Sequence, residues 1–165
     1  MGDFNIFIYN IDMIEQKKLI ELVKKMRIEL GLGMMEIKAA LEESDGDEKK
    51  AKEILKSKGL KKAESKKERE THQGRVATYT HATGKVGAMV ELLCETDFVA
   101  KNEEFMAVGR ELCLQVVAMD PENNEELLKQ EYIKDASKTI DVLVKELVAK
   151  FGENIKVGRF QRFEI

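Results

Sequence analysis

The sequence is poor in cysteine, histidine and proline, with two, two and one of these residues among 165. Cys94 lies on the apolar face of a predicted strand, and Cys113 lies near the apolar face of a predicted helix. These positions favour buried, reduced thiols over a disulfide. The two histidines, His72 and His81, do not combine with the cysteines at the spacing of metal ligands. We therefore expect no metal site and no cofactor.

Long hydrophobic runs are also absent. No stretch approaches the roughly 18 consecutive apolar residues of a membrane-spanning helix, and the N-terminus lacks the basic region of a signal peptide. A cytoplasmic location without membrane association is expected by default. The 28 basic and 31 acidic side chains nearly cancel, to a formal net charge of -3. This balance does not favour nucleic-acid binding.

Motifs for nucleotide binding or nucleophilic catalysis are missing or weak. The sequence has no phosphate-binding loop of the type Gly-x-x-x-x-Gly-Lys, so we expect no direct nucleotide binding. Cys94, His81 and Asp97 lie on neighbouring predicted elements, but Cys94 shares the inward parity of Val90 and Leu92. An inward thiol without a cationic neighbour is unreactive. We therefore expect that the chain is not an enzyme.

The N-terminal third is predicted to form a small helical unit. Residues 1 to 12 are apolar without a helical period, so we expect a disordered or loosely docked leader, with an added edge strand as the alternative. Across residues 13 to 59, apolar residues recur at helical spacing and mark three short amphipathic helices. Such a module resembles the ubiquitin-associated fold. Each helix is too short to persist alone in water, so packed apolar faces must hold the module together.

A highly charged segment follows at residues 60 to 73. The stretch from Lys56 to Glu70 carries seven positive and three negative side chains, with almost nothing to bury. Such a composition is typical of a solvated linker that is partly helical at most. The linker would let the helical module move relative to the rest of the chain.

The remainder of the chain begins and ends with strand patterns. The segment from Gly74 to Asp97 is predicted to form a β-hairpin, with its turn at Thr83-Gly84-Lys85. Residues 155 to 163 return to strand-like alternation, with Gly158 as a candidate bulge. A single hairpin is marginal alone, so the third strand is needed to complete a sheet.

Two helices are predicted between these strands. One runs from about Asn102 to Met119, and the second ends near Phe151 with Gly152 as its stop. Residues 74 to 165 should therefore form one core domain. The predicted fold class is α+β: an N-terminal three-helix ubiquitin-associated-like module, a charged linker, and a core of a three-stranded antiparallel sheet with helices.

A large ring lies beside an acid where the hairpin gives way to the next helix, at Phe98 and Asp97. Two interpretations are open from these residues alone. In one, Thr96, Asp97 or Asn102 caps the helix and Phe98 packs as a staple on its first turn. In the other, Phe98 is exposed and fills a pocket on a partner.

Three blocks of the sequence occur in the order of a known family. The run Glu-Thr-Asp-Phe-Val-Ala-Lys-Asn-Glu-Glu-Phe, from Glu95 to Phe105, resembles the signature of bacterial elongation factor Ts. The block Gly31-Leu32-Gly33-Met34-Met35 precedes it, and Gly152-Glu153-Asn154-Ile155 with Arg159-Phe160 follows it. The resemblance covers about residues 14 to 120 and 127 to 165.

The resemblance implies guanine nucleotide exchange on the GTPase elongation factor Tu. It implies that Asp97 and Phe98 wedge between two helices of the GTPase and disturb its magnesium and phosphate region. We assign the flanking residues Thr96 and Val99 to the same partner-binding set.

The resemblance also implies a second contact, made by the helical module. Arg27, Met34 and Met35 would meet a helix of the nucleotide domain of the GTPase. In the turn after Gly33, we expect Met34 to face outward and Met35 to be partly buried.

The chain departs from longer family members between Met119 and Leu127, where those members carry additional helices. It is therefore similar to a minimal form of the family. The resemblance leaves a homodimer open, although Gln161 offers no covalent link to a second chain. The alternative function is a non-catalytic protein-interaction module without exchange activity.

Overall fold

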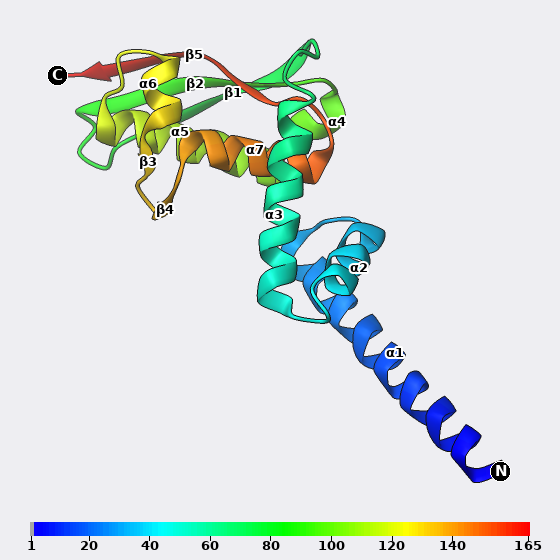
Figure 1. Ribbon diagram of the computed structural model, residues 1–165. Coiled ribbons are helices and arrows are strands. Elements are labelled where there is room, and N and C mark those ends of the chain that lie inside the picture. Colours follow the sequence, from blue (N-terminus) through cyan, green and yellow to red (C-terminus); the bar gives the residue numbers. More distant parts are fainter. Residues whose placement is uncertain (1) are drawn as a thin grey trace. The chain divides into compact units, whose positions relative to one another are not determined.

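The computed structural model describes the backbone of residues 2 to 165 and the side chains of residues 16 to 165. The chain divides into two compact units, Met1–Lys58 and Gly59–Ile165, which are called the first and second units below. Figure 1 labels their helices and strands. Among the described residues, no helix combines the length and the apolar character needed to cross a membrane.

The first unit is helical, as predicted. Its helices are α1 (Gly2–Leu30), α2 (Met34–Glu43) and the first part of α3 (Glu48–Glu64). Gly31 ends α1 in a left-handed conformation (φ 67°), and its N–H donates to the Arg27 carbonyl at 2.9 Å. The resemblance to the ubiquitin-associated fold stays a prediction. The buried apolar core contains Val23, Met26, Ile37, Ala40, Leu41, Ala51 and Leu55.

Residues 2 to 12 of the predicted leader belong in the structure to α1, which begins at Gly2. The edge-strand alternative was therefore wrong, because a helix satisfies its backbone groups internally and needs no neighbouring strand. The side chains of these residues lie outside the described part of the chain. Their predicted disorder in solution stays a prediction.

The second unit is built on the predicted antiparallel sheet. Strands β1 (Gln73–Thr80), β2 (Val86–Cys94) and β5 (Lys156–Glu164) pair in the order β1-β2-β5. The hairpin turn is closed by the His81 N–H donating to the Val86 carbonyl at 2.9 Å, and Gly84 supplies the positive φ of 69°. The α+β class and the three-stranded sheet are confirmed.

The predicted bulge in β5 is also confirmed. Val90 pairs with Phe160, whereas Leu92 pairs with Val157, so one extra residue of β5 lies opposite Glu91. Gly158 lies at this point, and a Cβ there would approach the Glu91 side chain to 2.9 Å. A glycine is required at this bulge because the neighbouring strand comes so close.

One face of the sheet is covered by α5 (Glu103–Met119) and α7 (Ile140–Phe151), which lie on the same side of it (Figure 1). Helix α5 packs directly on β1 and β2, and Gly109 allows this close approach, since a Cβ there would lie 3.0 Å from the Ala77 Cβ. The helix bounds confirm both predicted helices, including Gly152 as the left-handed stop of α7. The opposite face leaves Val76, Met89 and Phe163 exposed.

The prediction of a solvated linker at residues 60 to 73 was wrong for the part that is buried within the second unit. Helix α3 continues through Glu64, and Ala63 is buried in the core. Lys66 is 8% exposed, and its Nζ donates to the Gly152 carbonyl at the C-terminal end of α7. Burial and the positive charges of Arg69 and Lys62 lower the pKa of Lys66. Hydrophobic periodicity could not predict this burial, because it involves one small alanine and one lysine that is bound through its amine.

Four short elements were not predicted. A long-range contact explains the small second sheet, because the buried amide of Gln115 on α5 donates to the Glu131 carbonyl at 3.0 Å and accepts from the Ile133 N–H at 3.0 Å. Sequence periodicity contains no signal for such a contact. The four elements are α4 (Asp97–Ala100), α6 (Asn124–Lys129), β3 (Glu131–Tyr132) and β4 (Asp135–Thr139).

Both cysteines are free and buried, which confirms the predicted reduced thiols. Desolvation raises the pKa of Cys94 and of Cys113 from 9.0 to about 11. The thiols therefore stay protonated at pH 8, and the thiolate is the reactive form. We expect the aromatic disulfide dithiobis(nitrobenzoate) to label neither thiol of the native protein within minutes. In guanidinium chloride it should label both. Fast labelling of the native protein would contradict this burial.

Candidate partner-binding site

The exposed turn at the end of β2 is the most distinctive surface feature of the second unit. β2 ends at Cys94, the short helix α4 follows, and α5 begins at Glu103. Of the three candidate caps, Asn102 is confirmed as the cap of α5, since its Oδ1 accepts the Glu104 N–H at 2.9 Å. Thr96 precedes α4 in an extended conformation but makes no side-chain cap. The segment between β2 and α5 is therefore a defined turn and not an extension of α5.

Phe98 projects from this turn into solvent with 84% of its side chain exposed. The staple interpretation was therefore wrong, because a staple buries its ring against the helix that it precedes. Val99 and Ala100, which follow immediately, are 7% and 5% exposed and belong to the core. Val99 and Ala100 thus anchor the turn in the core, while the Phe98 ring points into solvent.

Asp97, the residue before Phe98, makes an ion pair within the turn. The Lys101 Nζ lies 2.6 Å from the Asp97 Oδ2, one helical turn further on. The hydrogen bond from Lys101 lowers the pKa of Asp97 below its ordinary value of 3.8. Asp97 therefore presents a negative charge at neutral pH, beside an apolar ring that has no cover within the second unit.

The other two predicted members of this set have a supporting position in the free chain. The Thr96 hydroxyl donates to the Glu153 carboxylate at 2.6 Å, and Val99 is buried beneath the turn. Both residues fix the conformation in which Asp97 and Phe98 are presented. Direct contact of Thr96 and Val99 with a partner stays a prediction.

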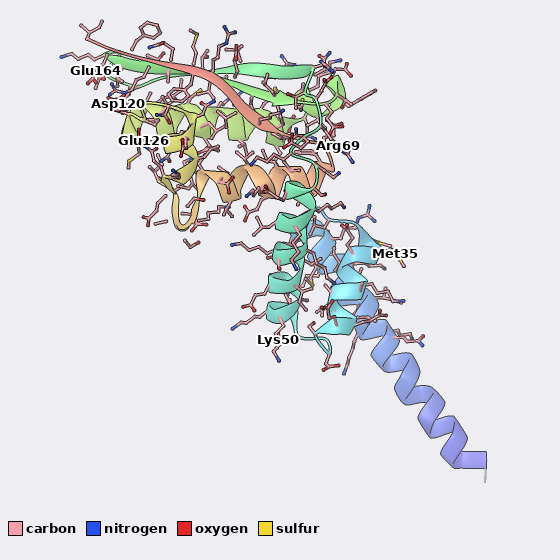
Figure 2. The ribbon with its side chains drawn as sticks, turned by 45° about the horizontal axis from the view of Figure 1, so that its top comes forward. Met35, Lys50, Arg69, Asp120, Glu126 and Glu164 are labelled. Carbon is pink, nitrogen blue, oxygen red and sulfur yellow. The ribbon has the colours of Figure 1, made fainter. Side chains whose placement is uncertain are left out.

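The first unit carries a second exposed apolar surface, around the turn between α1 and α2. Met34 is 46% exposed and Met35 is 76% exposed, so the partial burial expected for Met35 was wrong. The Met35 side chain projects from the start of α2 in Figure 2. The Arg27 side chain, at the end of α1, is exposed as well. These three predicted residues therefore lie within the first unit, whereas the turn at Phe98 belongs to the second.

Sequence reasoning missed two residues of interest. Ile28 is 88% exposed although it is a large aliphatic residue, and it follows Arg27 near the end of α1. Its position outside the buried stripe of Val23 and Met26 was a signal that could have identified it. Glu153, in the loop after α7, accepts a hydrogen bond from the Thr96 N–H in the turn at Phe98. A local sequence pattern cannot predict that contact.

Comparison with known proteins gives one consistent result. The model of the family described as Elongation factor TS matches residues 95–165. Elongation factor Ts from Leptospira biflexa serovar Patoc is 42% identical over 190 residues, which covers 88% of this chain and 96% of the relative. The protein of the same name from Thermosipho melanesiensis is 37% identical, with coverage of 88% and 97%.

A longer relative shows the same similarity. Elongation factor Ts from Aquifex aeolicus is 45% identical over 150 residues, covering 88% of this chain and 52% of that relative. The 190-residue alignment with the Leptospira protein exceeds the whole length of this chain, so that relative carries residues without a counterpart here.

Proposed function

Because the chain belongs to the elongation factor Ts family and is thus a translation elongation factor, we propose that it promotes the release of GDP from the GTPase elongation factor Tu. The observation that carries the proposal is the 84% exposed Phe98 ring beside the ionised Asp97, on a turn anchored in the core. The activity is an exchange of a bound ligand and requires no covalent chemistry. It would take place in the cytoplasm, where translation occurs.

The proposed action is a wedge. Phe98 enters between two helices of the GTPase, and Asp97 brings a negative charge toward its magnesium and phosphate region. Burying one phenylalanine contributes about 1.5 to 3 kcal/mol, and each 1.4 kcal/mol of differential binding changes nucleotide affinity about tenfold. The ring alone therefore supplies a weakening of roughly ten- to a hundredfold. Further binding energy must come from other contacts that favour the nucleotide-free GTPase.

The exposed residues of the first unit have a different proposed role, which is to supply affinity for the GTPase in both of its forms. Met34, Met35 and Arg27 anchor the chain on the nucleotide domain, and the exposed Ile28 adds apolar area next to Arg27. Methionine side chains adapt to the shape of a partner surface, which suits them to an anchor. Contacts that are equally strong before and after GDP release increase affinity without accelerating release.

A double variant tests this division of roles. We expect Met34→Ala with Met35→Ala to raise the concentration of factor needed for half-maximal GDP release by about tenfold, because exposed apolar anchors supply affinity. The maximal rate at saturation should change little. Met119→Ala is the matched control, since Met119 is 47% exposed but lies in the second unit. A fall in the maximal rate with unchanged half-saturation would contradict the anchoring role.

Binding measurements test the proposed function through its thermodynamics. Coupling is reciprocal, so GDP must weaken the binding of this chain as strongly as the chain weakens the binding of GDP. Isothermal titration should therefore give a much higher affinity for nucleotide-free elongation factor Tu than for the GDP complex. Equal affinities for the two forms, or no binding to either, would instead support the alternative of a non-catalytic protein-interaction module.

A further inference from the structure

Two glutamates in the second unit connect the Phe98 turn to the loop that follows α7. The Glu153 Oε2 accepts the N–H groups of Glu95 and Thr96, at 3.2 and 3.0 Å. The Glu153 Oε1 accepts the Thr96 hydroxyl at 2.6 Å. In return, the Glu95 Oε1 accepts the Asn154 N–H at 2.6 Å. Each carboxylate therefore binds the backbone of the segment that carries the other, and we call these four bonds the carboxylate latch.

The latch supplies bonds that the sheet cannot supply. Cys94 is the last residue of β2, so the N–H groups of Glu95 and Thr96 lie beyond the ladder. These two donors are partly buried and need acceptors, and a charged carboxylate is a stronger acceptor than a neutral oxygen. The extended conformation of Thr96 (φ -122°, ψ 158°) then leads directly into α4.

Neighbouring groups support the latch. The Arg69 Nη1 lies 3.6 Å from the Glu95 Oε1 and offsets the repulsion between the two carboxylates. The Asn154 side chain, 3% exposed, donates to the carbonyls of Lys67 and Arg69 at 3.0 and 2.6 Å. Figure 2 labels Arg69 close to this end of the second unit. The segment before β1, the turn and the loop after α7 are therefore tied together.

Helix α4 has four residues and cannot be stable by itself. Its conformation depends on the latch at its start and on the burial of Val99 and Ala100 beneath it. We propose that Glu153 is a positioning residue for exchange: its carboxylate holds the Glu95–Thr96 backbone so that Phe98 is presented in the orientation that enters the partner. The inference rests on the proposed function. Glu153 itself does not need to touch the GTPase.

Loss of the latch should reduce the maximal rate of GDP release and should not weaken binding to the GTPase. Correct orientation of a reacting or wedging group contributes to the rate at saturation, and a displacement of about 1 Å can cost about a hundredfold. For Glu153→Ala we expect the maximal rate of GDP release to fall at least about tenfold, with half-saturation changed less than about threefold. Glu153→Gln keeps one carbonyl oxygen able to accept both N–H groups, so it should recover most of the lost rate.

Two control variants separate positioning from general damage. Glu125→Ala removes an exposed carboxylate that pairs with Lys129 in the same unit, and it should behave as the wild type. Val148→Ala removes buried volume from the same helix, α7, and none of the latch bonds involves it. It should lower thermal stability while leaving the maximal exchange rate intact at temperatures far below unfolding.

Amide hydrogen exchange measured by nuclear magnetic resonance tests the latch without any partner. In the free protein, Glu153→Ala should accelerate exchange at the Glu95 and Thr96 amides by at least about tenfold, while amides in the middle of α5 keep their protection. If the wild type does not release GDP from elongation factor Tu, the proposed function fails. If the wild type is active and Glu153→Ala is equally active, or if Val148→Ala loses the same rate, the positioning role is overturned.

Discussion

Replacing Phe98 by alanine is expected to reduce the maximal rate of GDP release by roughly ten- to a hundredfold, the range that burial of one aromatic ring can supply. The free energy of unfolding should change by less than about 0.5 kcal/mol, as for other exposed positions. The reason is the 84% exposure of the side chain, which contributes almost nothing to the core. The exchange assay gives the first quantity and urea unfolding the second.

The matched control for Phe98→Ala is Phe163→Ala. Phe163 is 61% exposed and lies on β5, far along the sequence from the turn. The variant therefore removes an exposed ring of the same size from another surface. Its exchange rate should equal that of the wild type. Equal losses of rate and of stability in Phe98→Ala would favour a structural role for the ring and contradict the wedge.

The second large effect concerns the other phenylalanine of the same eleven-residue run. Phe105 is fully buried on α5, at 0% exposure. We expect Phe105→Ala to lower the free energy of unfolding by about 3 to 5 kcal/mol, because removing a buried ring loses transfer free energy and leaves a cavity. This is a large share of the roughly 5 to 15 kcal/mol that stabilises a typical domain.

Urea unfolding followed by circular dichroism measures the effect of Phe105→Ala. Conservative repacking provides the control: Phe105→Leu keeps much of the volume and should cost less than Phe105→Ala. A loss below about 1 kcal/mol in Phe105→Ala would contradict the position of this ring in the core. Together, the two phenylalanines show how one signature contains a residue for contact and a residue for folding.

Much of the fold was predictable because its signals are local. Alternation of Ala88, Val90, Leu92 and Cys94 predicted β2. The glycine at position 152 predicted the end of α7, and it adopts a left-handed conformation there. These patterns depend on side-chain periodicity and on backbone conformations that favour glycine. The three helices of the first unit were predicted on the same basis.

The misses share a different cause. The burial of Ala63 and Lys66 within the second unit, and the β3–β4 pair held by Gln115, depend on contacts between residues far apart in the sequence. The exposure of Phe98 was left open for the same reason, since a staple and an outward ring have the same local sequence. Only the position of the ring in the fold decides between them.

The site was predictable in part. Asp97, Phe98, Met34 and Met35 came from the resemblance to a family. In the structure Phe98, Met34 and Met35 are exposed, and Asp97 is partly exposed. Glu153 belonged to a block of the same resemblance but had no assigned role, because its three bonds to the turn join residues 57 or 58 positions apart in the sequence. Long-range polar contacts of this kind have no periodicity.

Release of a fluorescent GDP analogue from purified elongation factor Tu, chased by excess unlabelled GDP, tests the central claim most directly. The account predicts that the wild-type chain accelerates release at substoichiometric amounts, because each molecule leaves when new nucleotide binds and acts again. Phe98→Ala measured in parallel should retain binding and lose most of the acceleration. No acceleration by the wild type at a molar excess, with binding still detectable, would contradict the proposed exchange function.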